Sequence, residues 1–475
     1  MRSPDNRFER FMEPLTLAQI TGLANGVLVS GEAGAVVTRV STDSRTLQAG
    51  DLFVPLRGAN FDGHKFVSQA VERGAVGAMV EESWKGDVPP KFGLIRVSDT
   101  LAGYQTLAAN YRASLSLKVI AITGSNGKTS TKDFVAAALA KKFRVTKTEG
   151  NFNNHVGLPQ TMLAAGKEDQ IAVWEIGMNH PGEIAPLARL AIPDVAIITN
   201  IGIAHIEFMG SREAIAEEKG ALAEAVRPGG FVILNADDPF SERITKKSRA
   251  RVVLAGIENG SVRATDITQH STGSEFTILE GAHRCRAQLP VPGIHMVQNA
   301  MLAVAAGRAF GLSLEECAAG LASTPLTKAR LQIREIDGIQ FIDDSYNANP
   351  DSMKAALRTL LELDTEGRRI AVLGEMGELG DEFERGHRDV GECAATLRID
   401  ELIAAGRGGA IIAEAARKAG LEKSTAVDSA GEAAQMLEKI VAPGDLILVK
   451  GSRSARMERV MEEFAQRSRT EGVAP

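Results

Sequence analysis

Short apolar runs alternate with helical and polar stretches through the middle of the chain. Five of them are Val119–Ile122, Ile171–Trp174, Val195–Thr199, Phe231–Leu234 and Val252–Ala255. Near-continuous apolar runs of this length, separated by helices, are typical of a parallel sheet that is covered on both faces. The pattern therefore predicts a central α/β domain built on a parallel sheet.

The same alternation returns towards the C-terminus, in Arg369–Gly374, Glu401–Gly406 and Asp445–Lys450, each followed by glycine or ending in it. It predicts a second, doubly wound sheet whose carboxyl edge is a ligand-binding edge. Between the two sheets, Glu275–Pro290 predicts an antiparallel pair of strands and Gly293–Gly311 predicts a helix.

The first part of the chain, from about residue 12 to 112, has shorter β-type runs. Val36–Val40 and Gly50–Leu56 predict strands, and Lys65–Arg73 predicts a helix. We therefore predict an α/β fold of three domains: a small N-terminal α/β domain (1–114), a central parallel-sheet ATPase domain of the P-loop type (115–326) and a Rossmann-like doubly wound C-terminal domain (327–475).

Composition excludes several classes of protein. The 475 residues carry a net charge of −6 with a pI near 5.9, so no general basic field recruits nucleic acid or anionic lipid. No run approaches the ~18 apolar residues of a membrane span, and the first twelve residues lack the apolar core of a secretion signal. Three cysteines without a C-x-x-C pair fit a reducing compartment. We expect a cytoplasmic protein without membrane insertion.

A glycine loop follows the first apolar run of the central domain. Its T-G-S-N-G-K-T sequence stands between a strand and a helix start, where backbone N–H groups and a lysine cradle phosphates. Ile122 occupies the position where the usual Walker pattern has glycine. If ATP binds, Lys128 neutralises the β/γ-phosphates and the Thr129 hydroxyl ligates Mg²⁺. The predicted ATP-binding residues of the loop are Gly124, Ser125, Asn126, Gly127, Lys128, Thr129 and Ser130.

Two later strands of the same sheet end in groups that suit a cation. Glu175 closes the second run and His205 follows the third. Because the carboxyl ends of parallel strands meet at one edge, we expect both beside the glycine loop. Lys219, on a downstream helical stretch, would by its pattern alone be a solvated lysine. In the C-terminal domain, Asp343–Pro350 combines two acids with an Asn/Tyr turn, which predicts a polar site.

These segments together resemble the Mur ligase family, the ATP-dependent amide-forming enzymes of peptidoglycan synthesis. The T-G-S-N-G-K-T loop is that family's own variant, which accounts for Ile122. Further segments that carry the resemblance are Gly150–His155, Glu175–Ile184, Asp343–Pro350 and Leu373–Gly380.

The resemblance implies an acid–amino-acid ligase that uses ATP and Mg²⁺ and forms ADP and phosphate. The motifs are most similar to those of the member that adds D-alanyl-D-alanine to UDP-N-acetylmuramoyl-tripeptide, so these are the implied substrates. The tripeptide carboxylate would attack the γ-phosphoryl group to give an acyl phosphate, which the dipeptide amine would displace. We expect a monomer acting in peptidoglycan precursor synthesis, and so in cell wall growth, cell shape and division. One substrate would belong to each domain: nucleotide sugar, ATP and dipeptide in chain order.

The resemblance also assigns a catalytic set. Thr129 and Glu175 would ligate a first Mg²⁺ and His205 a second. The family carbamylates a lysine at the position of Lys219, which turns a cation into a metal-binding anion. Only a neutral amine reacts with CO₂, so Lys219 needs a lowered pKa, and the glutamates at 217 and 218 would oppose this if they point the same way. The implied catalytic residues are Lys128, Glu175, His205 and Lys219.

Other residues match binding positions of the family. Asn299 matches a position near adenine, and Arg330 and Asp344 match groups that reach the ATP phosphates and ribose when the domains close. Relatives often carry glycine where this chain has Ala329. The predicted substrate-binding residues are Thr42, Asp43, Ser44 and Arg45 for the UDP part, Asn153 and Asn154 for the muramoyl-peptide, and Tyr346, Asn347 and Asn349 in the C-terminal domain.

Two alternatives stay open. The first is another ligase of the superfamily, such as the enzyme that adds the third residue to the muramoyl peptide, or a folylpolyglutamate synthase. The segments Asp343–Pro350 and Leu373–Gly380 argue against both. The second is a P-loop ATPase switch, which would lack the pair of Glu175 and His205 and need no third domain. The sequence leaves undecided whether the tripeptide ends in diaminopimelate or lysine, and which residues contact D-alanyl-D-alanine.

Overall fold

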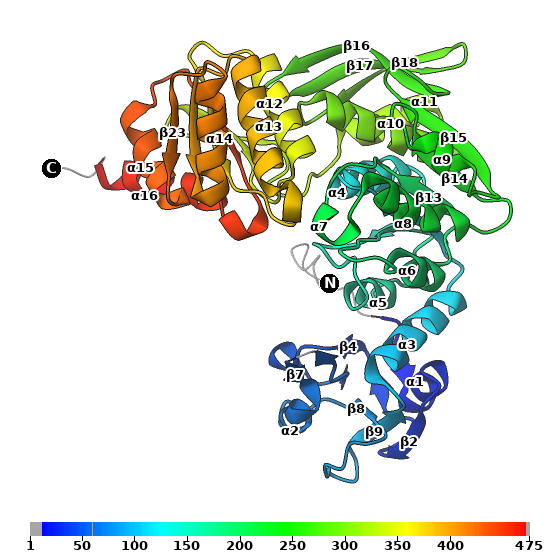
Figure 1. Cartoon of the computed structure of the whole chain (residues 1–475). Coiled ribbons are helices and arrows are strands. Elements are labelled where there is room, and N and C mark those ends of the chain that lie inside the picture. Colours follow the sequence, from blue (N-terminus) through cyan, green and yellow to red (C-terminus); the bar gives the residue numbers. More distant parts are fainter. Residues whose placement is uncertain (1–11, 59, 472–475) are drawn as a thin grey trace.

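The computed structural model describes residues 12–58 and 60–471, which form three α/β domains along the chain (Figure 1). The first eleven residues, on which the signal-peptide argument rests, lie outside them. Each domain has its own main sheet, as the apolar pattern predicts. The predicted boundary at 114/115 falls between α3 (Thr100–Ser114) and β10 (Lys118–Thr123). The boundary at 326/327 falls between α11 (Leu314–Ala322) and β19 (Gln332–Ile336). Both boundaries stay predictions.

The N-terminal domain has a five-stranded sheet in the order β2-β9-β8-β5-β4, parallel except for β2. The helices and strands of this domain that precede α3 are β1 (Leu15–Thr16), α1 (Leu17–Leu23), β2 (Val27–Ser30), β3 (Val36–Val37), β4 (Arg39–Ser41), β5 (Asp51–Phe53), β6 (Arg57–Gly58), β7 (Phe61–Asp62), α2 (Val67–Glu72), β8 (Gly77–Glu81) and β9 (Gly93–Val97).

The short runs of this domain are less regular than predicted. The strand expected over Val36–Val40 is divided, because the Thr38 N–H turns to the Gly50 carbonyl at 3.0 Å. Its two halves then join different partners, β3 pairing with β1 and β4 with β5. The helix expected over Lys65–Arg73 begins with a 3₁₀ turn, Gly63–Phe66, before α2.

The central domain has a nine-stranded sheet in the order β11-β12-β10-β13-β14-β15-β16-β17-β18. Its elements after β10 are α4 (Lys128–Leu139), β11 (Val145–Lys147), α5 (Gly157–Leu163), β12 (Ile171–Glu175), α6 (Ile184–Ala191), β13 (Val195–Ile198), α7 (Ile206–Met209), α8 (Arg212–Glu224), β14 (Phe231–Asn235), α9 (Ser241–Thr245), β15 (Arg251–Gly256), β16 (Val262–His270), β17 (Gly273–Glu280), β18 (His283–Leu289) and α10 (Ile294–Ala309).

All five predicted central strands are present and lie parallel, as β10, β12, β13, β14 and β15. The predicted antiparallel pair is β17 and β18, and the predicted helix is α10. The sequence pattern missed β11, which has only three residues at the sheet edge, and β16, which joins the antiparallel pair to the parallel strands.

The C-terminal domain has a six-stranded sheet in the order β19-β20-β24-β21-β22-β23, parallel except for β19. The doubly wound prediction is therefore confirmed. Its elements after β19 are β20 (Ile339–Asp344), α12 (Pro350–Glu362), β21 (Arg369–Gly374), α13 (Phe383–Thr396), β22 (Glu401–Ala405), α14 (Gly406–Lys418), β23 (Ser424–Val427), α15 (Ala430–Ile440), β24 (Leu446–Lys450) and α16 (Glu458–Glu471).

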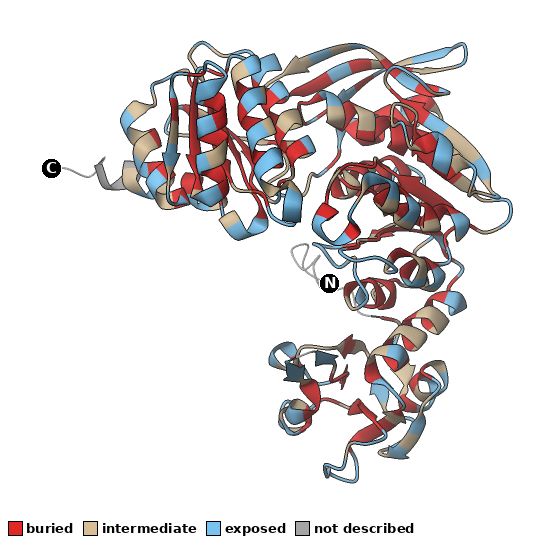
Figure 2. Cartoon of the chain, in the orientation of Figure 1, coloured by how far each residue is buried: buried red, intermediate tan, exposed pale blue. Residues whose placement is uncertain are grey.

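Buried strands form the core of each domain (Figure 2). Every residue of β12 is buried, as are Val119–Thr123 of β10, which explains why these runs lack polar alternation. Burial of each such Ile, Val or Leu side chain contributes about 1.5–3 kcal/mol. Helix α3 contacts α1 on one side and α5 and α6 on the other, so it joins the N-terminal domain to the central one. Within the part of the chain that is described, no helix is both long and apolar enough to cross a membrane.

The carboxyl edges of the central and C-terminal sheets come together where α7 meets the loop after β21 (Figure 1). The Ile203 N–H donates to Asp351 Oδ2 at 3.1 Å, and the Glu207 N–H donates to the Glu378 carbonyl at 3.3 Å. Groups from both domains can therefore act on one ligand.

Candidate active site

The glycine loop runs from the end of β10 into α4, as the sequence predicts. Gly124 and Gly127 have φ values of +150° and +79°, a backbone region that favours glycine. A Cβ at Gly127 would lie 2.5 Å from Asn299 Oδ1, and one at Gly124 would lie 1.8 Å from Thr199 Oγ1. The two glycines therefore allow neighbouring side chains to press directly on the loop.

Within the loop, Lys128 Nζ donates to the Gly124 carbonyl at 2.9 Å, which folds the amine back over the loop. Loss of hydration lowers the pKa of Lys128, and the nearby Glu175 carboxylate raises it in opposition. The Ser125 N–H donates to the Asn200 carbonyl at 2.9 Å, and the Asn126 N–H donates to Asn200 Oδ1 at 3.0 Å. Ser130 is buried in the first turn of α4.

Glu175 lies beside the loop at the end of β12, because β12 pairs with β10 in parallel. Thr129 Oγ1 donates to Glu175 Oε2 at 2.9 Å, and Asn153 Nδ2 donates to Oε1 at 2.8 Å. Glu175 is only 3% exposed. The structure thus brings together a hydroxyl and a carboxylate, both oxygen ligands of the kind that Mg²⁺ prefers.

His205 lies at the same edge but contacts the other domain. It has a left-handed backbone, with φ 63°, at the start of α7. Its Nδ1 lies 2.5 Å from Glu378 Oε2, and this imidazole holds the pKa of Glu378 below its usual range. Glu378 stands within Leu373–Gly380, and no local sequence pattern assigns it a role.

Lys219 is buried in α8, so the solvated position that its pattern alone suggests is wrong. Burial and then the like charge of Lys128 hold its pKa well below the usual lysine range, against a smaller opposing effect of Glu218. Glu217 points away, pairing with Lys247 and Arg243.

Glu218 is itself engaged, since it accepts from the N–H groups of Gly182 and Ile184 at 2.8 and 2.7 Å. In the described ranges, the Lys219 amine has no hydrogen-bond acceptor and no ion-pair partner.

The predicted nucleotide contacts come from both domains. Asn299, on α10, is buried against the loop at Gly127. Asp344 ends β20 and accepts from Lys450 Nζ at 2.5 Å. The Arg330 guanidinium lies 4.1 Å from the centre of the Tyr346 ring. Ala329, the departure from the family pattern, has φ 58°, a region in which glycine is unstrained.

Several predicted substrate residues have structural partners. Asn349 Nδ2 donates to Asn126 Oδ1 at 2.8 Å across the domain boundary, and Asn349 also caps α12. The Asn347 carbonyl accepts from Lys450 at 3.0 Å. Asn154 Oδ1 accepts from the N–H groups at the start of α5, at 2.9 and 3.1 Å. Their substrate roles stay predictions.

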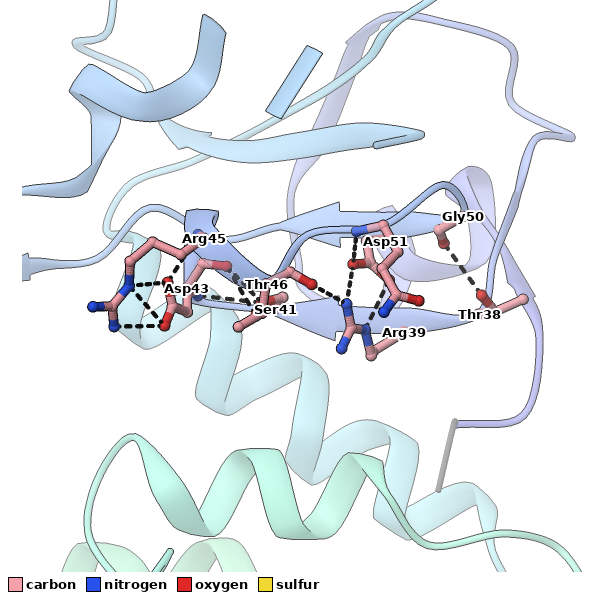
Figure 3. A network of polar contacts seen from close by, with 9 residues as sticks. Thr38, Arg39, Ser41, Asp43, Arg45, Thr46, Gly50 and Asp51 are labelled. Carbon is pink, nitrogen blue, oxygen red and sulfur yellow. Dashed lines mark hydrogen bonds and ion pairs between the residues drawn. The ribbon is translucent and has the colours of Figure 1, made fainter. Parts of the chain in front are cut away.

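The N-terminal loop after β4 forms a separate polar network (Figure 3). Asp43 caps the turn Ser44–Thr46 and binds Arg45 through Nε at 2.9 Å and Nη2 at 2.7 Å. Arg39 ties the loop to the sheet by bonds to Asp51 and the Thr46 carbonyl. The Arg45 side chain is 84% exposed. The predicted Thr42 lies between Ser41 and Asp43 in the same loop. Strand β4 contacts α5, the helix that follows Asn153 and Asn154 in the chain.

Three family models match the chain. They are the Mur ligase family catalytic domain over residues 36–90, the Mur ligase middle domain over 122–307 and the Mur ligase glutamate ligase domain over 329–453.

Known proteins are similar along almost the whole chain. A UDP-N-acetylmuramoyl-tripeptide–D-alanyl-D-alanine ligase of Bacillus subtilis is 40% identical over 95% of this chain and 98% of its own. A crystal structure of MurF from Acinetobacter baumannii has a TM-score of 0.88 at 34% identity, over 96% of this chain and 99% of that one. A MurF ligase of Thermotoga maritima in complex with ADP has a TM-score of 0.81 at 28% identity, over 91% and 98%.

Proposed function

The chain belongs to the Mur ligase family, and we propose that it joins D-alanyl-D-alanine to UDP-N-acetylmuramoyl-tripeptide with hydrolysis of ATP to ADP and phosphate. The relatives that carry this activity in their name cover at least nine-tenths of the chain, so no domain is left for a different task. A ligase of another substrate class would require different acceptor contacts on the same framework.

The observation that carries the proposal is the meeting of two domains at the glycine loop. Asn349 of the C-terminal domain bonds Asn126 of the loop, and Glu378 contacts His205. An ATPase switch needs only the central domain, whereas a ligase must bring a second acceptor to the same phosphoryl group.

The donor set beside the loop fits Mg²⁺. The oxygens of Thr129 and Glu175 are already neighbours, and we assign them to a first ion. We assign His205 and a carbamylated Lys219 to a second. The carbamate fits the environment of Lys219, since a buried ammonium next to Lys128 and without an acceptor in the described ranges is costly. Bound Mg²⁺ would supply positive charge to the phosphoryl oxygens.

The chain's own groups handle the repulsion between the reactants. A carboxylate brought within ~4 Å of a phosphate charge is repelled by about 4 kcal/mol at an effective dielectric of 20. Lys128, held over the loop, offsets this repulsion at the β- and γ-phosphates. The tripeptide carboxylate then attacks the γ-phosphorus, ADP leaves, and the dipeptide amine displaces phosphate from the acyl phosphate.

Substrate binding follows the order of the domains. We assign the UDP part to the loop of Thr42, Asp43, Ser44 and Arg45, whose exposed guanidinium can pair with a diphosphate. The muramoyl-peptide would pass Asn153 and Asn154 towards Glu175. Asn299 would contact adenine, and Arg330 and Asp344 the phosphates and ribose. We also propose that the protein acts as a monomer in the cytoplasm.

Phosphate release tests the proposal directly. We expect release from ATP and Mg²⁺ only when UDP-N-acetylmuramoyl-tripeptide and D-alanyl-D-alanine are both present. Tripeptides ending in diaminopimelate and in lysine should be compared. Steady release without the dipeptide would contradict a ligase and favour an ATPase switch.

The carbamate has its own test. Equilibration with ¹³CO₂ should give a carbamate carbon signal in wild-type protein that Lys219→Ala removes. Lys247→Ala is the matched control, because Lys247 is a partly buried lysine whose amine pairs with Glu217 and Glu224. A signal that persists in Lys219→Ala would rule out this site.

A further inference from the structure

A cavity of about 520 Å³ opens between the central and C-terminal domains. Its lining comes from Glu207 on α7, from the loop of residues 375–381, and from Phe383, Glu384 and Arg407. Its size falls in the range of ~300–1,000 Å³ that is usual for small-molecule sites. We call it the acceptor cavity.

The charges of the acceptor cavity are strongly one-sided. Its lining contains a single cationic side chain, Arg407, and five carboxylates: Glu207, Glu375, Glu378, Asp381 and Glu384. Such a lining repels a polyanion such as a nucleotide and attracts an ammonium group. A ligand that also carries one carboxylate can place that group only beside Arg407.

Arg407 has no carboxylate of its own. Its guanidinium lies 5.1 Å from the centre of the Phe383 ring, an arrangement that orients the group. In the described part of the chain it forms no ion pair, despite the five carboxylates of the same cavity. It also stands in the first turn of α14, where the helix dipole disfavours a cation. Helix stability therefore does not account for an arginine at this position.

The opposite side of the cavity reaches the phosphoryl-transfer site. Glu378 lines the cavity and also contacts His205 Nδ1. His205 follows β13, which pairs in parallel with β10, so Glu378 lies at the sheet edge that carries the glycine loop. A ligand that extends from Arg407 towards Glu378 therefore points its far end at the acyl phosphate.

We propose that Arg407 binds the carboxylate of the incoming dipeptide and so fixes which end of it faces the acyl phosphate. The inference rests on the proposed function and adds the contact that selects the acceptor. A dipeptide is a zwitterion, with an ammonium group for the acidic side and one carboxylate for Arg407. Bidentate pairing between guanidinium and carboxylate also fixes orientation, which a lone lysine charge would do less well.

The test compares two acceptors with two proteins. D-Alanyl-D-alanine and its C-terminal amide differ only in the carboxylate that Arg407 would bind. We expect Arg407→Gln to raise the KM for the dipeptide about 10- to 100-fold, as the loss of a charged hydrogen bond implies. The amide should be poorer than the dipeptide with wild-type protein by a similar factor, and Arg407→Gln should not weaken it further.

Controls separate the possible failures. Arg388→Gln changes an exposed arginine on α13 outside this cavity and should leave both acceptors unaffected. Arg407→Lys keeps the charge and should recover part of the loss. An equal loss for dipeptide and amide, or none, would overturn the role of Arg407. If wild-type protein used neither acceptor, the proposed function itself would fail.

Discussion

The glycine-loop site and the acceptor cavity lie at the same meeting of two sheets, yet they are built in opposite ways. At the loop, Thr129, Glu175 and Asn299 are buried and bonded or packed within one domain. The acceptor cavity is open, is lined by two domains, and holds an arginine whose contact is an aromatic ring.

This difference matches the demands on the two halves of the reaction. Charge that develops on transferred phosphoryl groups is best stabilised by groups that are fixed in advance. An acceptor that enters after the acyl phosphate has formed needs a site that can open, and a boundary between domains provides one. We therefore expect substitutions at the loop to lower kcat strongly. At the domain boundary, we expect the effect of a substitution to depend on the side chain that faces it from the other domain.

The largest effect is expected at Lys128. Lys128→Ala removes the positive charge over the loop and should lower kcat about 10²- to 10³-fold, as removal of one fixed electrostatic contact does elsewhere. Lys141→Ala, an exposed lysine just beyond the same helix, should have no effect. Phosphate release at saturating substrates measures both. A small effect of Lys128→Ala would mean that the loop is not the phosphate site.

The domain boundary should respond strongly to Gly202→Ala. A Cβ at this position would lie 2.4 Å from Asp351 Oδ2, so either the Asp351 carboxylate or the backbone at Gly202 would have to shift. Overpacking of about 1–3 kcal/mol would lower kcat roughly 10- to 100-fold.

Asp351→Ala in the same chain removes the obstructing oxygen, and the double variant should recover most of the activity. Asp351→Ala alone loses only its bond to the Ile203 N–H and should have a smaller effect. If the double variant stayed as poor as Gly202→Ala, the loss would come from the loop backbone and not from the boundary.

The sequence predicted which residues meet at the glycine loop, but it did not predict which residues of the two domains line the acceptor cavity, and the reasons are physical. Strand ends, the glycine loop and the carboxylate of Glu175 follow from local patterns, because parallel strands bring their carboxyl ends to one edge. Burial of Lys219 does not, since it depends on how α8 packs on the sheet. Contacts such as Asn349 with Asn126 join residues from separate domains, and no local pattern encodes them.

Stability against pH gives a third way to test the boundary. His295, on α10, lies close to Thr359 of the C-terminal domain at Gly293, and burial lowers its pKa to about 4. The unfolded chain therefore binds a proton between about pH 6.5 and 4 that the folded chain does not, so stability falls as pH falls through this window.

His295→Gln should remove this dependence. We expect wild-type protein to lose about 1–2 kcal/mol more than His295→Gln between pH 7 and 4, less than the full pKa difference because the ring keeps some contact with water. Urea unfolding at several pH values measures the two slopes. His270→Gln, on β16 in the same domain, is the control. Equal slopes for wild type and His295→Gln would show that the ring is not held neutral.

The smallest effect on stability is expected in the linker between the central and C-terminal domains, residues 323–331. Ala329 and Leu331 both have left-handed backbones, with φ 58° and 52°, and the linker is tied to α4 by Thr327, whose hydroxyl donates to Asp133 at 2.7 Å. An alanine in this conformation is strained by about 1 kcal/mol relative to glycine. Part of the stability gained by relieving this strain is offset by the greater freedom of glycine in the unfolded chain.

Ala329→Gly should therefore stabilise the protein by about 0.5 kcal/mol and leave kcat unchanged. The control, Ala319→Gly in α11, should destabilise the protein by about 1 kcal/mol. Destabilisation by Ala329→Gly would mean that the greater freedom of glycine in the unfolded chain outweighs the relief of backbone strain at this position.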